Sequence, residues 1–251
     1  MRRAILALLI GLPVGLLALI GLEVALLSRR EFLPPDPGYR IDAVVQPAAG
    51  STAPVLELAV LGDSTVAGVG SPTEAESLAV LVAQRVADAL VRPVHIVGHG
   101  VAGARTATVG VQLDAVADGT DALLIVVGAN DATHATPWPA FAEQTRALLA
   151  AAAAGGRPVV LGSTPRFHGT DIIPQPLRFM VDTYAGVLRG EQRAAVAATP
   201  GTRLADLALV APRFEGVPEA TSRDGFHPSP IGYGFWADAL AAELVAGLQI
   251  G

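Results

Sequence analysis

The sequence contains a serine, an aspartate and a histidine that could together form an activated nucleophile. Ser64 closes a Gly-Asp-Ser turn after an apolar run, and Asp224 and His227 lie in a glycine-containing loop near the C-terminus. A serine hydroxyl attacks well only when a base takes its proton, and a histidine base needs an acceptor on its other ring nitrogen. These residue types indicate attack on an ester or a similar carbonyl group. Each also has an ordinary interpretation as a turn or capping residue.

Two further loops could donate hydrogen bonds to the oxyanion that such an attack creates. Gly100 lies in a glycine-rich loop, Gly98-His99-Gly100-Val101-Ala102-Gly103, where a backbone N–H could approach a substrate closely. Asn130 lies in the loop Gly128-Ala129-Asn130-Asp131 and offers a side-chain amide. The alternative for this second loop is a polar turn that ends a strand.

Predicted strands and helices place these loops at one edge of a sheet. The apolar run at 55–61 predicts a buried strand ending just before Ser64, and ligands of open α/β sheets bind beyond the carboxyl ends of the strands. Strands alternating with helices predict an α/β fold, a three-layer α/β/α sandwich with a parallel sheet. The predicted strands are 55–61, 94–97, 122–127, 158–162 and 203–207, and the predicted helices are 73–90, 106–117, 139–154, 177–198 and 230–248.

The four loops, in this order, resemble the sequence blocks of the SGNH (GDSL) hydrolases. The blocks are G-D-S at 62–64, the glycine block at 98–103, G-x-N-D at 128–131 and D-x-x-H at 224–227, and the resemblance extends over about 55–248. It implies a flavodoxin-like fold and a serine esterase that forms an acyl-enzyme, without a cofactor. It also implies Ser64 as nucleophile, His227 as general base and Asp224 as its orienting carboxylate. The backbone N–H groups of Ser64 and Gly100 and the side-chain amide of Asn130 would then form the oxyanion hole.

One departure and several alternatives accompany this resemblance. Many relatives have asparagine where this chain has Gly98, which weakens the hydrogen bonding expected in that loop. Lipases, lysophospholipases and thioesterases share the same blocks, and a catalytically silent SGNH-like domain that binds a glycan or partner would also carry them. The loop at 98–103 also fits the G-x-G-x-x-G pattern of dinucleotide-binding domains, with Asp121 about 20 residues further on.

The composition excludes several other classes. With a net charge of −6 and no basic stripe, the 251-residue chain is not expected to bind nucleic acid. The absence of cysteine excludes disulfides and cysteine nucleophiles, and the histidines show no metal-ligand spacing, so no metal is expected. The expected partner is a small-molecule, glycan or lipid ester. The oligomeric state is left open.

The N-terminal segment predicts membrane attachment. Residues 4–27 are apolar except for Glu23, and a helix of that length could cross a hydrocarbon core. We therefore expect a transmembrane anchor at 1–30, a proline-rich linker at 31–53 and a hydrolase domain at 54–251. The expected localisation is a single-pass membrane protein with an extracytoplasmic domain.

Large apolar side chains in the loops after the third and fourth strands could form an acyl pocket. Trp138, Phe167 and Ile172 are the candidates, with core packing as the alternative interpretation. Few residues are left outside the predicted elements to build a lid, so we expect a shallow pocket. Short acyl esters, from acetyl to about hexanoyl, should be preferred.

Overall fold

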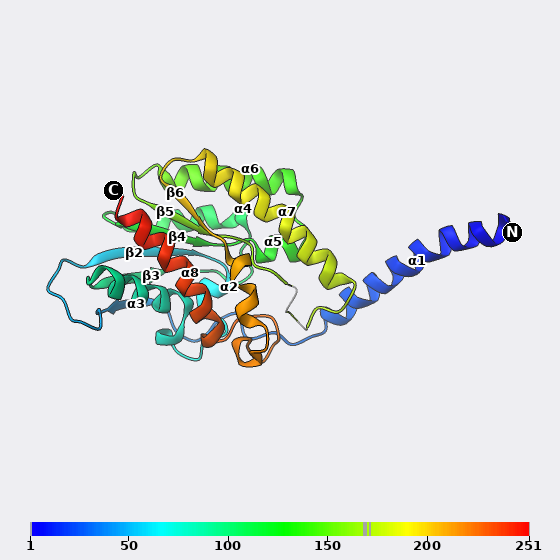
Figure 1. The fold of residues 1–251 in the computed structure, drawn as a ribbon, viewed down its shortest axis with the longest axis horizontal. Coiled ribbons are helices and arrows are strands. Elements are labelled where there is room, and N and C mark those ends of the chain that lie inside the picture. Colours follow the sequence, from blue (N-terminus) through cyan, green and yellow to red (C-terminus); the bar gives the residue numbers. More distant parts are fainter. Residues whose placement is uncertain (1, 168–169, 171, 251) are drawn as a thin grey trace.

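The computed structural model describes residues 2–167, 170 and 172–250, with only the backbone for residues 2–12 (Figure 1). The strands are β1 (Asp42–Val45), β2 (Leu56–Gly62), β3 (Val94–Gly98), β4 (Ala122–Val126), β5 (Val159–Gly162) and β6 (Thr202–Ala205). The α-helices are α1 (Arg2–Leu27), α2 (Ser64–Ala67), α3 (Leu78–Leu90), α4 (Thr106–Val109), α5 (Ala129–Thr133), α6 (Trp138–Ala153), α7 (Leu177–Ala198) and α8 (Pro230–Leu248). Shorter 3₁₀ helices are η1 (Glu74–Glu76), η2 (Gly110–Ala115), η3 (Leu207–Phe214) and η4 (Pro218–Ala220).

The described strands form one sheet in the order β1-β3-β2-β4-β5-β6. From β3 to β6 the strands are parallel and follow the flavodoxin-like order. In this order β3 is added on one side of β2, and β4, β5 and β6 are then added in turn on the other side. The predicted α/β architecture is thus confirmed. The sheet is mixed, however, so the prediction of a purely parallel sheet is wrong at one edge.

That edge is β1, which comes from the segment predicted as a linker at 31–53. It pairs antiparallel with β3, from Asp42 opposite Val97 to Val45 opposite Val94. Four residues suffice for this strand because Ile41 and Val45 are buried against the neighbouring core. Because prolines flank this four-residue strand, the composition of the segment predicted a linker.

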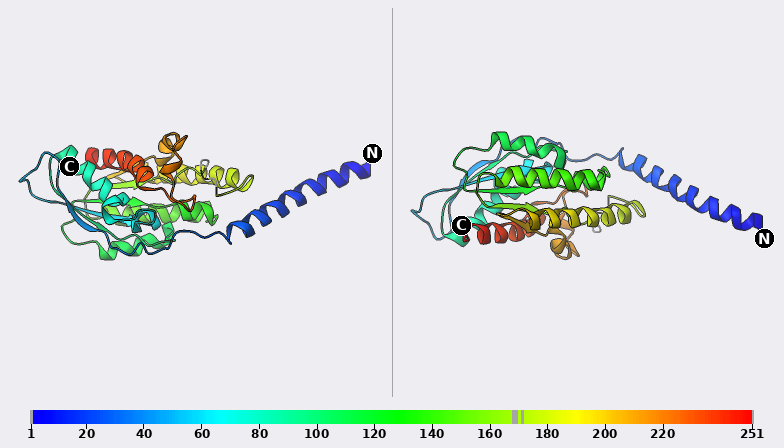
Figure 2. Two further views of the ribbon diagram at one scale, coloured as in Figure 1. Left: turned by 90° about the horizontal axis from the view of Figure 1, so that it is seen from below. Right: turned by 90° about the horizontal axis from the view of Figure 1, so that it is seen from above.

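The two faces of the sheet are covered by different helices (Figure 2). Successive side chains of a strand point to opposite faces. In β2, Leu58 and Val60 therefore join the core beneath α3 and α8, whereas Ala59 and Leu61 join the core beneath α6 and α7. Burial on both faces explains why the central strands are continuously apolar.

Two helices differ from their predicted bounds. The helix predicted from Thr73 begins at Leu78, because Ser77 caps it by accepting a hydrogen bond from the N–H of Val80. The helix predicted at 106–117 is only the four residues of α4, followed by η2. The glycine-rich loop before α4 is therefore not followed by the long helix that the dinucleotide-binding interpretation requires.

The predicted transmembrane helix at 4–27 is wrong. A helix does form there and extends away from the domain (Figure 1), but none in the described part of the chain is long and apolar enough to cross a membrane. Its C-terminal end packs on the domain instead. Glu23 is only 5% exposed and its carboxylate accepts a hydrogen bond from the N–H of Leu177 (2.9 Å), while Leu27 packs against the cluster around Phe141. The last turns of the apolar run thus belong to the packing of the domain.

Candidate active site

Ser64 lies at the carboxyl end of β2, where the sequence predicts a crevice. It is the first residue of α2, and Asp63 caps that helix by accepting hydrogen bonds from the N–H and the hydroxyl of Thr65 (3.0 and 2.9 Å). The N–H of Ser64 has no acceptor within so short a helix. The strand end therefore presents a hydroxyl and a backbone donor at the same point.

The structure brings Ser64, His227 and Asp224 together in one hydrogen-bonded row. The Oγ of Ser64 is 3.0 Å from Nε2 of His227, and Nδ1 of the same ring is 2.6 Å from Oδ2 of Asp224. An ionised carboxylate can only accept, so the ring proton lies on Nδ1 and leaves Nε2 free to accept from the serine hydroxyl. This is the tautomer that a general base needs.

Hydrogen bonds within its loop keep the carboxyl group of Asp224 ionised. Burial would raise the pKa of its carboxyl group, but the hydrogen bond from the His227 ring and those from the N–H groups of Phe226 and His227 outweigh burial. The pKa is thereby lowered to about 2. At neutral pH, Asp224 is therefore an ionised acceptor for the imidazole.

The loop is closed by contacts that fix the histidine. The N–H of Ser222 donates to the carbonyl of His227 (2.8 Å), and the Ser222 hydroxyl donates to the carbonyl of Pro228 (2.9 Å). Gly225 takes a φ of +68°, which places it in the left-handed region that glycine adopts easily. Since α8 begins directly afterwards, with Ser229 as its cap, the histidine is anchored to a long buried helix.

Asn130 and Gly100 lie beside Ser64. Asn130 is in α5, directly after β4, and its Nδ2 donates to the carbonyl of Ala104 (3.0 Å), which leaves one amide hydrogen for another acceptor. Gly100 packs against the turn that carries Ser64. A Cβ at this glycine would overlap the backbone of Ala67 and lie 2.8 Å from the carbonyl oxygen of Asp63. Asn130 thus lines both cavities together with Ser64, and Gly100 lies against the turn that carries this serine.

Comparison with known proteins matches the chain to a family. Residues 60–235, well over half of the chain, match the GDSL-like lipase/acylhydrolase family. The chain belongs to this family. The GDSL-like esterase Rv1075c of Mycobacterium tuberculosis is 33% identical over 193 residues, or 75% of this chain, and the chain spans 62% of that relative.

Solved structures of a lipase/acylhydrolase and of an esterase share the fold. The lipase/acylhydrolase from Enterococcus faecalis has a TM-score of 0.61 and 22% identity, covering 76% of this chain and 96% of that one. The psychrotrophic esterase EstA from Pseudoalteromonas sp., solved with monoethylphosphonate as an inhibitor, has a TM-score of 0.59 and 18% identity, covering 77% and 98%. At these identities the similarity concerns the fold alone.

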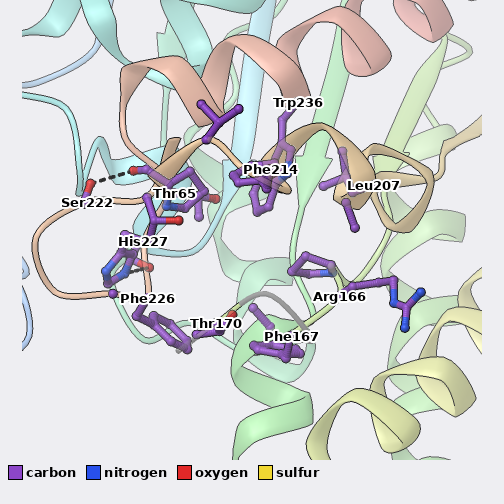
Figure 3. Close-up of a pocket in the computed structure, with 18 of the residues that line it drawn as sticks. Thr65, Arg166, Phe167, Thr170, Leu207, Phe214, Ser222, Phe226, His227 and Trp236 are labelled. Carbon is purple, nitrogen blue, oxygen red and sulfur yellow. Dashed lines mark hydrogen bonds between the residues drawn. The ribbon is translucent and has the colours of Figure 1, made fainter. Parts of the chain in front are cut away.

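In this GDSL-like family member, two cavities flank Ser64 and His227. The larger, of about 590 Å³, is shown in Figure 3, with Leu207, Phe214 and Trp236 on one side and Phe167 on the other. The smaller has a volume of about 370 Å³. Both volumes are within the range of small-molecule sites.

Of the three residues predicted to line an acyl pocket, one lines a cavity and two do not. Phe167 lines the larger cavity and is 3% exposed. Trp138 begins α6, is 52% exposed and does not line either cavity. Ile172 packs against the cluster around Phe141, and a Cβ at Gly225 would touch it, so it supports the histidine loop from outside the cavities.

Several functional positions have little signal in the sequence. The wall formed by Leu207 and Phe214 is in η3, an eight-residue 3₁₀ helix that was not predicted, although the large apolar residues of this segment could have suggested a role. Buried polar side chains also support the site. Asp131 accepts from the N–H and hydroxyl of Thr106 (2.9 and 3.0 Å) and so joins two of the loops, but its sequence context is that of any polar turn.

The donor groups at the site do not suit a metal ion. Among the residues that the structure describes, no group of three or more His, Asp or Glu side chains is arranged to hold one. The polar groups next to Ser64 are hydrogen-bond donors and one paired imidazole. This set is suited to proton transfer and to stabilising an oxyanion.

Proposed function

We propose that this protein is a serine esterase that hydrolyses carboxylic esters through an acyl-enzyme. The observation that carries the proposal is the row of hydrogen bonds from Ser64 through His227 to an ionised Asp224, at the mouth of two cavities. Membership in a family named for lipases and acylhydrolases supports ester hydrolysis in general.

The first half of the reaction forms the acyl-enzyme. The Oγ of Ser64 attacks the carbonyl carbon of the ester while its proton passes to Nε2 of His227. The resulting oxyanion accepts hydrogen bonds from the backbone N–H groups of Ser64 and Gly100 and from the amide of Asn130. When the tetrahedral intermediate collapses, the bond to the alcohol oxygen breaks and His227 returns its proton to that oxygen.

The second half releases the acid. A water molecule attacks the acyl carbon and gives its proton to Nε2 of His227, and the second oxyanion uses the same donors. Collapse of this intermediate breaks the bond to Oγ of Ser64, which recovers the proton. Asp224 accepts from Nδ1 throughout and stabilises the imidazolium that forms twice in each cycle.

The proposed substrates are esters with short acyl groups, from acetyl to about hexanoyl. The two cavities beside Ser64, of about 590 and 370 Å³, have the size of small-molecule sites, which favours a short acyl group over a long lipid chain. A lipase or lysophospholipase would prefer long acyl chains, and a thioesterase would prefer a sulfur leaving group. A series of p-nitrophenyl esters and the matching thioesters distinguishes these alternatives.

Labelling with a fluorophosphonate tests the proposal without knowledge of the natural substrate. The wild-type chain should be labelled, and Ser64→Ala should not. Ser64→Ala and His227→Ala should each lower kcat by about 10³-fold or more, and the double variant should be little worse because the two act as a unit. Ser51→Ala, at a serine that lines neither cavity, is the matched control and should keep wild-type labelling and kcat.

Two results would count against this function. If Ser64→Ala kept wild-type esterase activity, Ser64 would not be the nucleophile. If the folded wild-type chain were neither labelled nor active on any ester in the series, the catalytically silent binding domain would be favoured instead.

A further inference from the structure

The smaller cavity has a wall that the GDSL-like blocks do not supply. One side consists of residues from the end of α1 and the segment after it: Val24, Leu27, Ser28, Phe32, Leu33 and Pro35. The other side contains Val69 and Ile173, and Ser64, Asn130 and His227 also line it. The N-terminal segment 24–35 therefore forms an outer wall of the candidate active site.

This wall is fixed to the domain at both ends. Near its start, the buried carboxylate of Glu23 accepts from the N–H of Leu177, the first residue of α7 (2.9 Å). Near its end, the N–H of Leu33 donates to Oδ2 of Asp224 (3.3 Å). Between these contacts Leu27 packs against the buried cluster around Phe141.

Aromatic contacts connect the same wall to the histidine. The ring of Phe32 meets that of Phe226 edge to face, with centroids 5.6 Å apart. Phe226 in turn lies edge to face with the ring of His227, at 5.2 Å. A change in the position of segment 24–35 would therefore reach the hydrogen bonds of His227 through direct contacts.

The two cavities differ in chemistry. The smaller is bounded mainly by aliphatic and aromatic side chains, and Ser64 and Asn130 line both cavities. The larger also has Arg166, Glu215 and Arg223 among its lining residues. An ester bound with its carbonyl at Ser64 would thus find an apolar space on one side and a more polar one on the other.

We propose that the smaller cavity binds the acyl chain of the ester and that segment 24–35 determines which chain lengths are accepted. This inference rests on the proposed function and deepens it. The alcohol half would then face the larger cavity. Burial of each methylene against Val24, Leu27 and Phe32 favours binding by roughly fourfold, so the shape of this wall should control kcat/KM for each chain length.

The test uses two residues on the same helix of the full-length chain. Val24 lines the cavity and is 49% exposed, whereas Leu26 does not line it and is 53% exposed. Val24→Trp should lower kcat/KM for p-nitrophenyl hexanoate at least tenfold and change that for the acetate less than twofold. Leu26→Trp should leave both values within twofold of wild type.

Two more variants make the outcome decisive. Val24→Ala removes volume from the wall with little risk to folding, and should raise the ratio of octanoate to acetate hydrolysis by about two- to threefold. Ala211→Trp narrows the larger cavity, and should leave the hexanoate-to-acetate ratio unchanged.

The possible failures are distinguishable. If Val24→Trp and Val24→Ala both leave the chain-length profile of an active enzyme unchanged, or if Ala211→Trp lowers the hexanoate-to-acetate ratio instead, the acyl chain does not bind against segment 24–35 and only this inference fails. A folded wild-type chain that hydrolyses no ester and takes no fluorophosphonate label would overturn the inference together with the proposed function.

Discussion

Single hydrogen bonds decide what each residue at the site can do. Asp224 accepts from two backbone N–H groups and from the ring of His227, which keeps its carboxyl group ionised, and from the N–H of Leu33. Asn130 divides its amide between the carbonyl of Ala104 and the space beside Ser64. Asp224 thus holds the ring proton of His227 on Nδ1, and Asn130 keeps one amide hydrogen for an acceptor in that space.

Asn130→Ala should lower kcat by about 10²–10³-fold with little change in KM, because an oxyanion donor acts in the transition state more than in the bound substrate. Steady-state kinetics on a short p-nitrophenyl ester measure both constants. Gln84→Ala, which removes an amide on α3 that lines neither cavity, is the control and should keep wild-type kinetics. A variant altered only in KM would assign Asn130 to substrate binding.

At the scale of elements, close backbone contact between loops sets the geometry. The loop after β3 packs on α2 at Gly100, and the N–H of Val101 donates to the carbonyl of Gly62 (3.0 Å). Gln112 in η2 accepts from the N–H of Gly62 (2.8 Å) and donates to its carbonyl (2.9 Å). The turn bearing Ser64 is therefore held from two sides by other elements.

Gly100→Ala should disrupt this packing, because the new methyl group would overlap backbone atoms of Ala67, which cannot rotate away. We expect a loss of at least about 2 kcal/mol in the free energy of unfolding and a large loss of fluorophosphonate labelling. Urea unfolding measures the first effect. Gly110→Ala, where nothing lies within 4 Å of the added Cβ and the backbone is helical, should be nearly neutral or slightly stabilising. Equal effects of the two substitutions would contradict the packing argument.

The strand edge near β1 contains a pH-dependent contact. His95 in β3 lies between Asp42 in β1 (2.8 Å to Nε2) and Glu57 in β2 (2.6 Å to Nδ1). The hydrogen bond with Asp42 raises the pKa of the imidazole, and the bond and charge of Glu57 add to the rise against the opposing effect of burial. Since protonated His95 pairs with both carboxylates, its charged form stabilises the attachment of β1.

The sign follows from a pKa that is higher in the folded than in the unfolded chain. The stabilisation is fully present below the unfolded value of about 6.5 and is lost as the pH rises through the raised folded value. His95→Gln should therefore cost about 0.5–1 kcal/mol more at pH 6 than at pH 9, a modest difference because the partners are largely exposed. Thermal unfolding at both pH values measures it, and a cost that is equal or greater at pH 9 would refute this role.

At the scale of the whole molecule, the segment before β2 is part of the structure of the site. Glu23 contacts the start of α7, Leu33 contacts Asp224, and Ile41 packs on Gly98 at the end of β3. A Cβ at Gly98 would lie 2.9 Å from the Cβ of Ile41. The absence of a side chain at Gly98 thus makes room for this N-terminal contact.

Glu23→Ala should loosen that segment, because it leaves the N–H of Leu177 at the start of α7 without its carboxylate acceptor. We expect faster hydrogen exchange in residues 24–35 and a loss of about 1 kcal/mol in the free energy of unfolding. The exposed Glu31 supplies the control, and Glu31→Ala should change neither quantity. Unchanged exchange in Glu23→Ala would mean that this hydrogen bond does not hold the segment.

The sequence by itself determined the central sheet and the order of the site loops. The strands around Leu58 and Leu124 are buried on both faces, so their apolar runs stand out locally, and the polar residues that follow them mark the crevice edge. The alternation of strands and helices then dictates parallel pairing, because each helix returns the chain to the same edge of the sheet.

Only the tertiary structure decided which distant segments complete the site. The contact of Leu33 with Asp224 joins residues 191 apart, and no periodicity or spacing signals such a pairing. Trp138 lies outside the cavities because, at the start of α6, its side chain is on the solvent-exposed face of the helix. The apolar run at 4–27 predicted a membrane span, whereas the structure buries the carboxylate of Glu23 against the N–H of Leu177 at the start of α7. Local patterns record burial and chain direction, whereas the partner of each buried group is set by packing between segments far apart in the sequence.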